Sequence, residues 1–125
     1  MKIFLGQFNP TIGDLKGNTN KILDISSMAF QNSANLVITP ELSLWGYPPK
    51  DLLLNKGLID EQNFLLDKLS LEISKNYGDI SVTVGIAEKI DDAFFPNLYN
   101  SIALLENGNW KIIARKNILP TYEVF

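Results

Sequence analysis

The stretch NTNKILDISSMAFQNSANLVIT, residues 18–39, decides the fold. Its first part, residues 18–31, repeats apolar side chains at helical spacing and predicts an amphipathic helix, with its N-cap among residues 17–19. Its last part, residues 36–39, is a short apolar run with β-branched side chains, which is typical of a buried strand. Another apolar run, residues 2–8, predicts a strand before the helix. Strand, helix and strand in this order form a parallel βαβ unit, so the sequence indicates the α/β class.

The rest of the chain predicts a second helix and three more strands. The apolar spacing of residues 58–75 indicates the helix, and residues 80–86 (ISVTVGI) give the strongest strand pattern. Two further apolar runs, residues 98–105 and 110–115, flank a turn at 106–109 that contains Asn-Gly, which predicts a β-hairpin.

An irregular loop, residues 40–49, follows the second strand at its carboxyl end, and residues 51–54 could form a short helix. Open α/β sheets bind their ligands at the carboxyl ends of the strands. We therefore expect the functional site at this loop.

Composition excludes several kinds of site. The 125 residues contain no Cys and no His, which excludes disulfides, Cys-based zinc sites, a thiol nucleophile and an imidazole base within them. With 11 Lys+Arg against 14 Asp+Glu, the net charge of −3 argues against nucleic acid or an anionic membrane as a partner. No apolar run approaches the roughly 18 residues that span a bilayer, and the first run is too short for a signal peptide. We expect a cytoplasmic protein.

Two charged residues are candidates for chemistry, each with an ordinary alternative. Glu41 follows a buried strand, where a carboxylate can act as a general base, although a solvated loop residue has the same appearance. Lys116 ends the second hairpin strand, where an ammonium could stabilise an oxyanion, although it could equally be a surface lysine. Arg115 should point to the opposite face of that strand and is interpreted as a surface or ion-pairing residue.

The combination of motifs resembles a known family. The segments TPEL (39–42) and KNILP (116–120) resemble the Glu and Lys motifs of the nitrilase, or carbon-nitrogen hydrolase, superfamily. The run GYPPKDLLL (46–54) is similar to the glutaminase domains of glutamine-dependent NAD synthetases. So are LYNS (98–101), LPTYEVF (119–125) and the opening QFNPTIGDLKGN (7–18).

This resemblance implies a nitrilase-like α-β-β-α sandwich and a glutaminase site. In such a site a Glu acts as base, a Lys stabilises the oxyanion and a Cys attacks the side-chain amide of glutamine, releasing ammonia. By the resemblance, Glu41 is the base and Lys116 the stabiliser, while Tyr122 and Phe125 contribute to the substrate pocket. The site itself needs no cofactor and no metal. A synthetase domain elsewhere in such proteins uses ATP and Mg²⁺ to amidate nicotinic acid adenine dinucleotide, giving NAD.

The sequence departs from the family pattern at one point. The family's Cys lies downstream of the Lys motif, whereas these residues end at Phe125. We therefore expect residues 1–125 to be the N-terminal part of a glutaminase domain, inactive alone, whose parent enzyme partners with glutamine and its own synthetase domain and forms a homo-oligomer. We also expect strand edges and an apolar sheet face to be left uncovered. The alternatives are a truncated amidase-type relative that acts on another amide, and a short non-catalytic paralogue that serves as a binding module.

Overall fold

A computed structural model describes residues 1–47, 52, 55–91 and 96–118 of the chain. Its strands are β1 (Ile3–Leu5), β2 (Leu36–Ile38), β3 (Ser81–Asp91), β4 (Pro96–Glu106) and β5 (Asn109–Ile118), and its helices are α1 (Leu15–Gln31) and α2 (Lys56–Tyr77). The predicted order of elements is confirmed. Of the short helix expected at 51–54, only residue 52 lies within the described residues.

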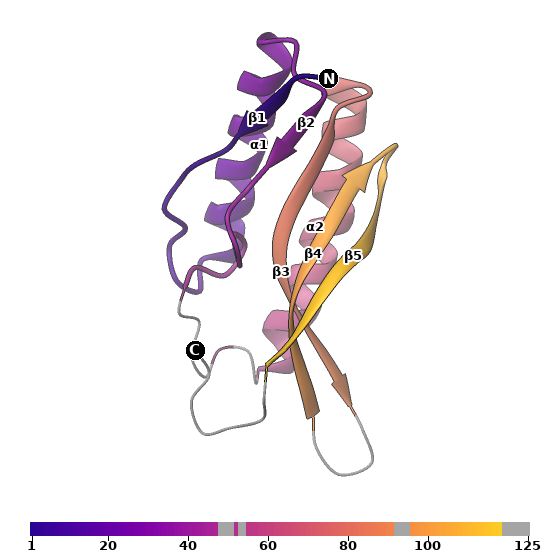
Figure 1. Ribbon diagram of the computed structural model, residues 1–125. Helices are drawn as coiled ribbons and strands as arrows, with labels where there is room; N and C mark the ends of the chain where they lie inside the picture. The colour runs from indigo at the N-terminus through magenta and orange to yellow at the C-terminus, as the bar shows by residue number, and fades with distance from the viewer. Residues whose placement is uncertain (48–51, 53–54, 92–95, 119–125) are drawn as a thin grey trace.

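The five strands form one mixed sheet in the order β1-β2-β3-β4-β5. β1, β2 and β3 run parallel, and β3, β4 and β5 pair antiparallel, so β3 joins the two halves of the sheet. The predicted βαβ unit and the predicted hairpin are therefore both present, one on each side of β3 (Figure 1).

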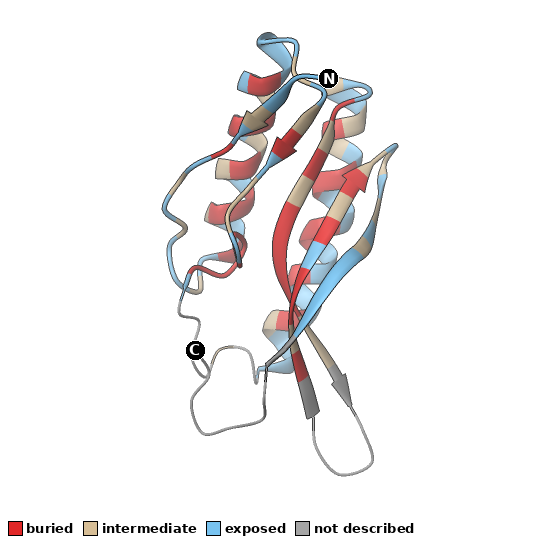
Figure 2. Ribbon diagram, in the orientation of Figure 1, coloured by how far each residue is buried: buried red, intermediate tan, exposed pale blue. Residues whose placement is uncertain are grey.

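Both helices cover the same face of the sheet and bury the core against it (Figures 1 and 2). Residues that pair across neighbouring strands on this face, such as Val37, Val82 and Leu105, are fully buried beneath the helices. The helices contribute Ile22, Ala29, Leu66 and Leu69 to the same cluster. Burial of these side chains is the main stabilising contribution to the arrangement.

On the opposite face of the sheet no helix of the described residues covers the strands, and the loop after β2 crosses the sheet only near Gly85. Apolar side chains are left exposed on this face, as expected. Its exposed apolar side chains are Ile3, Leu5, Ile38 and Ile102, which alternate along the strands with the buried ones. We call this surface the open face. None of the helices in the described part of the chain is long and apolar enough to cross a membrane.

The start of α1 differs from the prediction, which placed the N-cap among residues 17–19. The cap is Asp14, whose side chain accepts a hydrogen bond from the Gly17 backbone nitrogen at 3.0 Å. This bond satisfies a backbone donor that the first turn of the helix leaves free. Asn18 is instead buried inside the helix and bonds to two loops, donating to the Leu44 carbonyl at 2.9 Å and accepting from the Thr11 nitrogen at 2.8 Å.

Candidate active site

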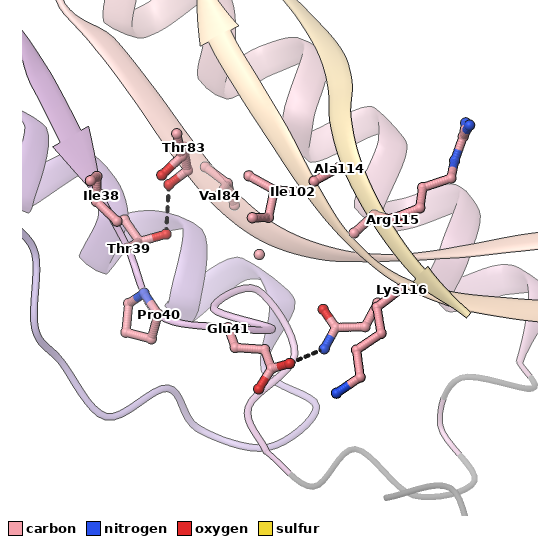
Figure 3. A pocket seen from close by; sticks show the side chains of 13 residues that line it. Ile38, Thr39, Pro40, Glu41, Thr83, Val84, Ile102, Ala114, Arg115 and Lys116 are labelled. Atoms are coloured by element: carbon pink, nitrogen blue, oxygen red, sulfur yellow. Dashed lines mark hydrogen bonds between the residues drawn. The ribbon is translucent and has the colours of Figure 1, made fainter. Parts of the chain in front are cut away.

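A pocket of about 340 Å³ opens on the open face where β2 ends (Figure 3). Four segments line it: residues 38–41 at the end of β2, residues 83–85 of β3, residues 100–102 of β4 and residues 114–116 of β5. The pocket therefore lies at the loop where the sequence predicted a site, and it contains both Glu41 and Lys116.

Glu41 lies in a loop that folds back across β3, and the contacts between this loop and β3 fix its position. The Leu44 nitrogen donates to the Gly85 carbonyl at 3.1 Å, and the Gly85 nitrogen donates to the Ser43 hydroxyl at 2.9 Å. The Thr39 hydroxyl donates to the Thr83 carbonyl at 2.7 Å, so the start of the loop is tied to the same strand. This approach requires glycine at position 85, because a Cβ there would lie 2.2 Å from the Leu42 nitrogen.

The far side of the loop is fixed by a buried glutamine on α2. Gln62 accepts hydrogen bonds from the Trp45 indole nitrogen at 2.5 Å and the Ala87 backbone nitrogen at 2.9 Å, and it donates to the Ala87 carbonyl at 2.7 Å. Trp45 is completely buried. These bonds join the Glu41 loop, α2 and β3 into one unit.

The Glu41 carboxylate is exposed to the pocket and held from one side. Its Oε1 accepts a hydrogen bond from the side-chain nitrogen of Asn100, which is buried in β4. The bond is the dashed line at Glu41 in Figure 3. Asn100 stands directly opposite Lys116 in the β4–β5 register, so both side chains belong to the same row of the open face.

Lys116 is exposed and extends toward the same part of the pocket as Glu41 (Figure 3). Within the described residues the one ion pair joins Arg115 to Glu88, so the Lys116 ammonium is not paired with a carboxylate there. A carboxylate and an unpaired ammonium facing one largely apolar pocket can accept a proton and stabilise a developing negative charge, respectively.

Arg115 points away from this pair, as predicted, and forms the ion pair with Glu88 at 2.6 Å. Burial is the largest single effect on the pKa of the Glu88 carboxyl and raises it. Hydrogen bonds from Arg115 and Ser101, together with the charge of Arg115, outweigh burial and hold that pKa below its usual value. The same hydrogen bond and charge raise the pKa of Arg115. The pair is a structural contact between β3 and β5.

The structure brings together two of the four site residues that the sequence predicted. Glu41 and Lys116 share the pocket, whereas Tyr122 and Phe125 lie outside the described residues. Sequence reasoning missed Asn100 and Gly85 as parts of the site. The available signals were an amide in the middle of a predicted strand and a glycine inside the strongest strand pattern, which often marks a close backbone approach.

Comparison with protein families places this pocket in a known context. A family model described as carbon-nitrogen hydrolase matches residues 2–124. The glutamine-dependent NAD(+) synthetase of Synechocystis sp. is 38% identical over 123 residues, which are 98% of this chain and 22% of that protein. The chain therefore spans about a fifth of the length of this curated relative.

Solved structures agree with the fold. The glutamine-dependent NAD+ synthetase of Acinetobacter baumannii, in complex with ADP, superposes with a TM-score of 0.76 at 33% identity, over 98% of this chain and 22% of that one. An amidase from Nesterenkonia sp. superposes with a TM-score of 0.69 at 20% identity, over 98% of this chain and 44% of that one, and shares the fold. The predicted nitrilase-like fold is confirmed, with this chain covering part of each domain it matches.

Proposed function

This chain belongs to the carbon-nitrogen hydrolase family, and we propose that it forms the N-terminal part of the glutaminase domain of a glutamine-dependent NAD synthetase. One observation carries the proposal: Glu41 and Lys116, which match the family's Glu and Lys motifs, line one pocket on the open face. The similarity to synthetases from Synechocystis and A. baumannii, at 38% and 33% identity, supports this substrate class over other amides.

In the proposed reaction, glutamine and water give glutamate and ammonia. Glu41 takes the proton from a cysteine thiol, and the thiolate attacks the side-chain amide carbon. The ammonium of Lys116 stabilises the oxyanion that forms. As this intermediate collapses, Glu41 returns the proton to the leaving nitrogen, which departs as ammonia and leaves a thioester. Water then hydrolyses the thioester to glutamate and the free thiol. Tyr122 and Phe125 are proposed to border the substrate.

The cysteine must come from outside these 125 residues, which contain none. We therefore propose that the 125 residues alone do not hydrolyse glutamine, because removing a covalent nucleophile costs several orders of magnitude in rate. In the whole protein, ammonia would pass to a synthetase domain that uses ATP and Mg²⁺ to convert nicotinic acid adenine dinucleotide to NAD. That enzyme would be a cytoplasmic homo-oligomer with no need of nucleic acid or membrane.

Reading the coding DNA beyond the Phe125 codon is the first test. An in-frame continuation with a cysteine and a later ATP-pyrophosphatase loop supports the proposal. A cysteine-bearing domain that ends without a synthetase domain would favour the amidase alternative. A stop codon directly after Phe125 would favour the binding module.

The second test uses the full-length protein and two nitrogen donors. Glu41→Gln should reduce NAD formation with glutamine to a small residual rate and leave NAD formation with ammonium unchanged. Glu61→Gln, an exposed residue of α2, is the matched control and should retain both activities. Loss of both activities in Glu41→Gln would contradict a role confined to glutamine hydrolysis.

A further inference from the structure

Among the described residues, Asn100 is the one whose side chain donates a hydrogen bond to the Glu41 carboxylate, and no role was predicted for it from the sequence. Asn100 is 8% exposed, and its side-chain nitrogen donates a hydrogen bond to Oε1 of Glu41, a residue 59 positions away in the sequence. In the sheet it lies between Ala87 of β3 and Lys116 of β5. The contact therefore ties a loop residue to the most extensively paired part of the sheet.

The chemistry of the contact fixes its direction. An ionised carboxylate only accepts hydrogen bonds, so the asparagine must present its amide nitrogen, not its oxygen, to Glu41. The amide is neutral and does not take up a proton at ordinary pH, so it cannot compete with Glu41 for the proton being transferred. Oε1 is occupied by this bond, and Oε2 accepts no hydrogen bond from any described residue.

The location of Glu41 explains why such a contact matters. Glu41 is exposed, lies in a loop and has three side-chain torsions, so it could adopt several rotamers. A base has to be within hydrogen-bonding reach of the proton that it removes. Because Asn100 and Lys116 stand opposite each other on adjacent strands, a carboxylate bound to Asn100 keeps a fixed position relative to the backbone that carries Lys116.

We propose that Asn100 is a positioning residue for glutamine hydrolysis, which holds Glu41 by Oε1 and leaves Oε2 as the oxygen that accepts the proton. This inference rests on the proposed function. Asn100 acts through Glu41 and does not touch the reacting bond. Its loss should therefore lower kcat and leave glutamine binding largely intact.

The test compares Asn100→Ala and Asn100→Asp with the wild-type full-length protein. With glutamine, kcat should fall about 10- to 100-fold in both variants, as expected for a misplaced catalytic group. The KM for glutamine, NAD formation with ammonium and the melting temperature should not change. Asn100→Asp preserves the shape of the side chain, so it decides the result if Asn100→Ala fails to fold. Asn109→Asp makes the same charge change at the exposed end of β5 and should behave as wild type.

A second readout separates positioning from structural support. Added to Glu41→Gln, Asn100→Ala should cause no further loss of the residual glutamine-dependent rate, because its partner is already lost. A further loss, or a wild-type kcat in both Asn100 variants, would overturn the positioning role while leaving the proposed function standing. A wild-type protein that forms NAD from ammonium and not from glutamine would overturn the proposed function and this inference together.

Discussion

Gly85 of β3 lies directly against the backbone of Leu42, so close that a Cβ at position 85 would stand 2.2 Å from the Leu42 nitrogen. The Pro40 carbonyl oxygen would be 2.6 Å away. Both neighbours flank Glu41, and both are backbone atoms, which cannot rotate aside as the end of a side chain can. The position of Glu41, the proposed base, thus depends on residue 85 of β3 being a glycine, which has no side chain.

Gly85→Ala should therefore displace the loop that carries Glu41. Overpacking of this kind costs about 1–3 kcal/mol of stability. A displacement of about 1 Å at a catalytic group can reduce the rate about 100-fold. We expect glutamine-dependent NAD formation by the full-length protein to fall accordingly, while ammonium-dependent formation persists. Gly57→Ala, in the exposed first turn of α2, should be tolerated. Wild-type rates in Gly85→Ala would show that the loop is not held as described.

Lys116→Ala should remove the charge that is proposed to stabilise the oxyanion. Loss of a single such group costs about 100- to 1,000-fold in kcat. Initial rates of NAD formation with glutamine and with ammonium measure the effect, and only the glutamine reaction should slow. Lys111→Ala, at an exposed position of the same strand, removes an equal charge and should have little effect. An equal loss of both reactions in Lys116→Ala would contradict the assignment.

Gln62→Leu should destabilise the fold, because it removes a buried hydrogen-bonding hub. The Trp45 indole and the Ala87 backbone would lose their partners, and a buried unsatisfied polar group costs about 1–3 kcal/mol. Thermal unfolding should show a clearly lowered midpoint. Gln31→Leu makes the same change at the exposed end of α1 and should leave the midpoint nearly unchanged. Equal effects of the two substitutions would mean that the hub adds no stability.

The Glu88–Arg115 pair should make stability depend on acidic pH. The pKa of Glu88 is lowered in the folded state, so its contribution is present above its usual pKa and is lost as the pH falls through the lowered value. Glu88→Gln should lower the melting temperature at neutral pH, and its difference from wild type should shrink on acidification. Arg115 is half exposed, so the effect should be small.

The partner substitution checks this assignment. Arg115→Gln should reproduce the effect of Glu88→Gln, and combining the two should add little, because both remove the same contact. Fully additive effects would show that the two residues stabilise the fold independently.

The helices and strands could be predicted from the sequence better than their arrangement in the sheet. Helical and strand periodicity reports which side chains face the core, so α1, α2 and the hairpin were expected close to their observed bounds. Periodicity does not report the order of the strands in the sheet. That order places β3, β4 and β5 beside β2, and Lys116 of β5 therefore lines the same pocket as Glu41. The cap at Asp14 was missed because several residues before the helix could serve equally well.

Asn100 and Gly85 were missed for a related reason. Both lie on the open face, where a polar or small residue has the same pattern as an ordinary solvent-exposed position. Their roles arise from a loop that follows a different strand and crosses over them. Their sequence signals are weak, and the tertiary arrangement shows that both residues contribute to the pocket.

The position of β3 between parallel and antiparallel neighbours has a consequence for how the chain folds. The antiparallel strands β3, β4 and β5 are consecutive in sequence, whereas β2 reaches β3 through a connection that contains α2. Contacts between nearby segments form faster than contacts that close long loops. Asn100 and Lys116 should therefore be in place early on the folding pathway, and Glu41 should join them only when β2 docks. A partly folded chain that keeps its hairpin would hold Lys116 without Glu41, so the two proposed catalytic residues should come together only when β2 and β3 pair, late in folding.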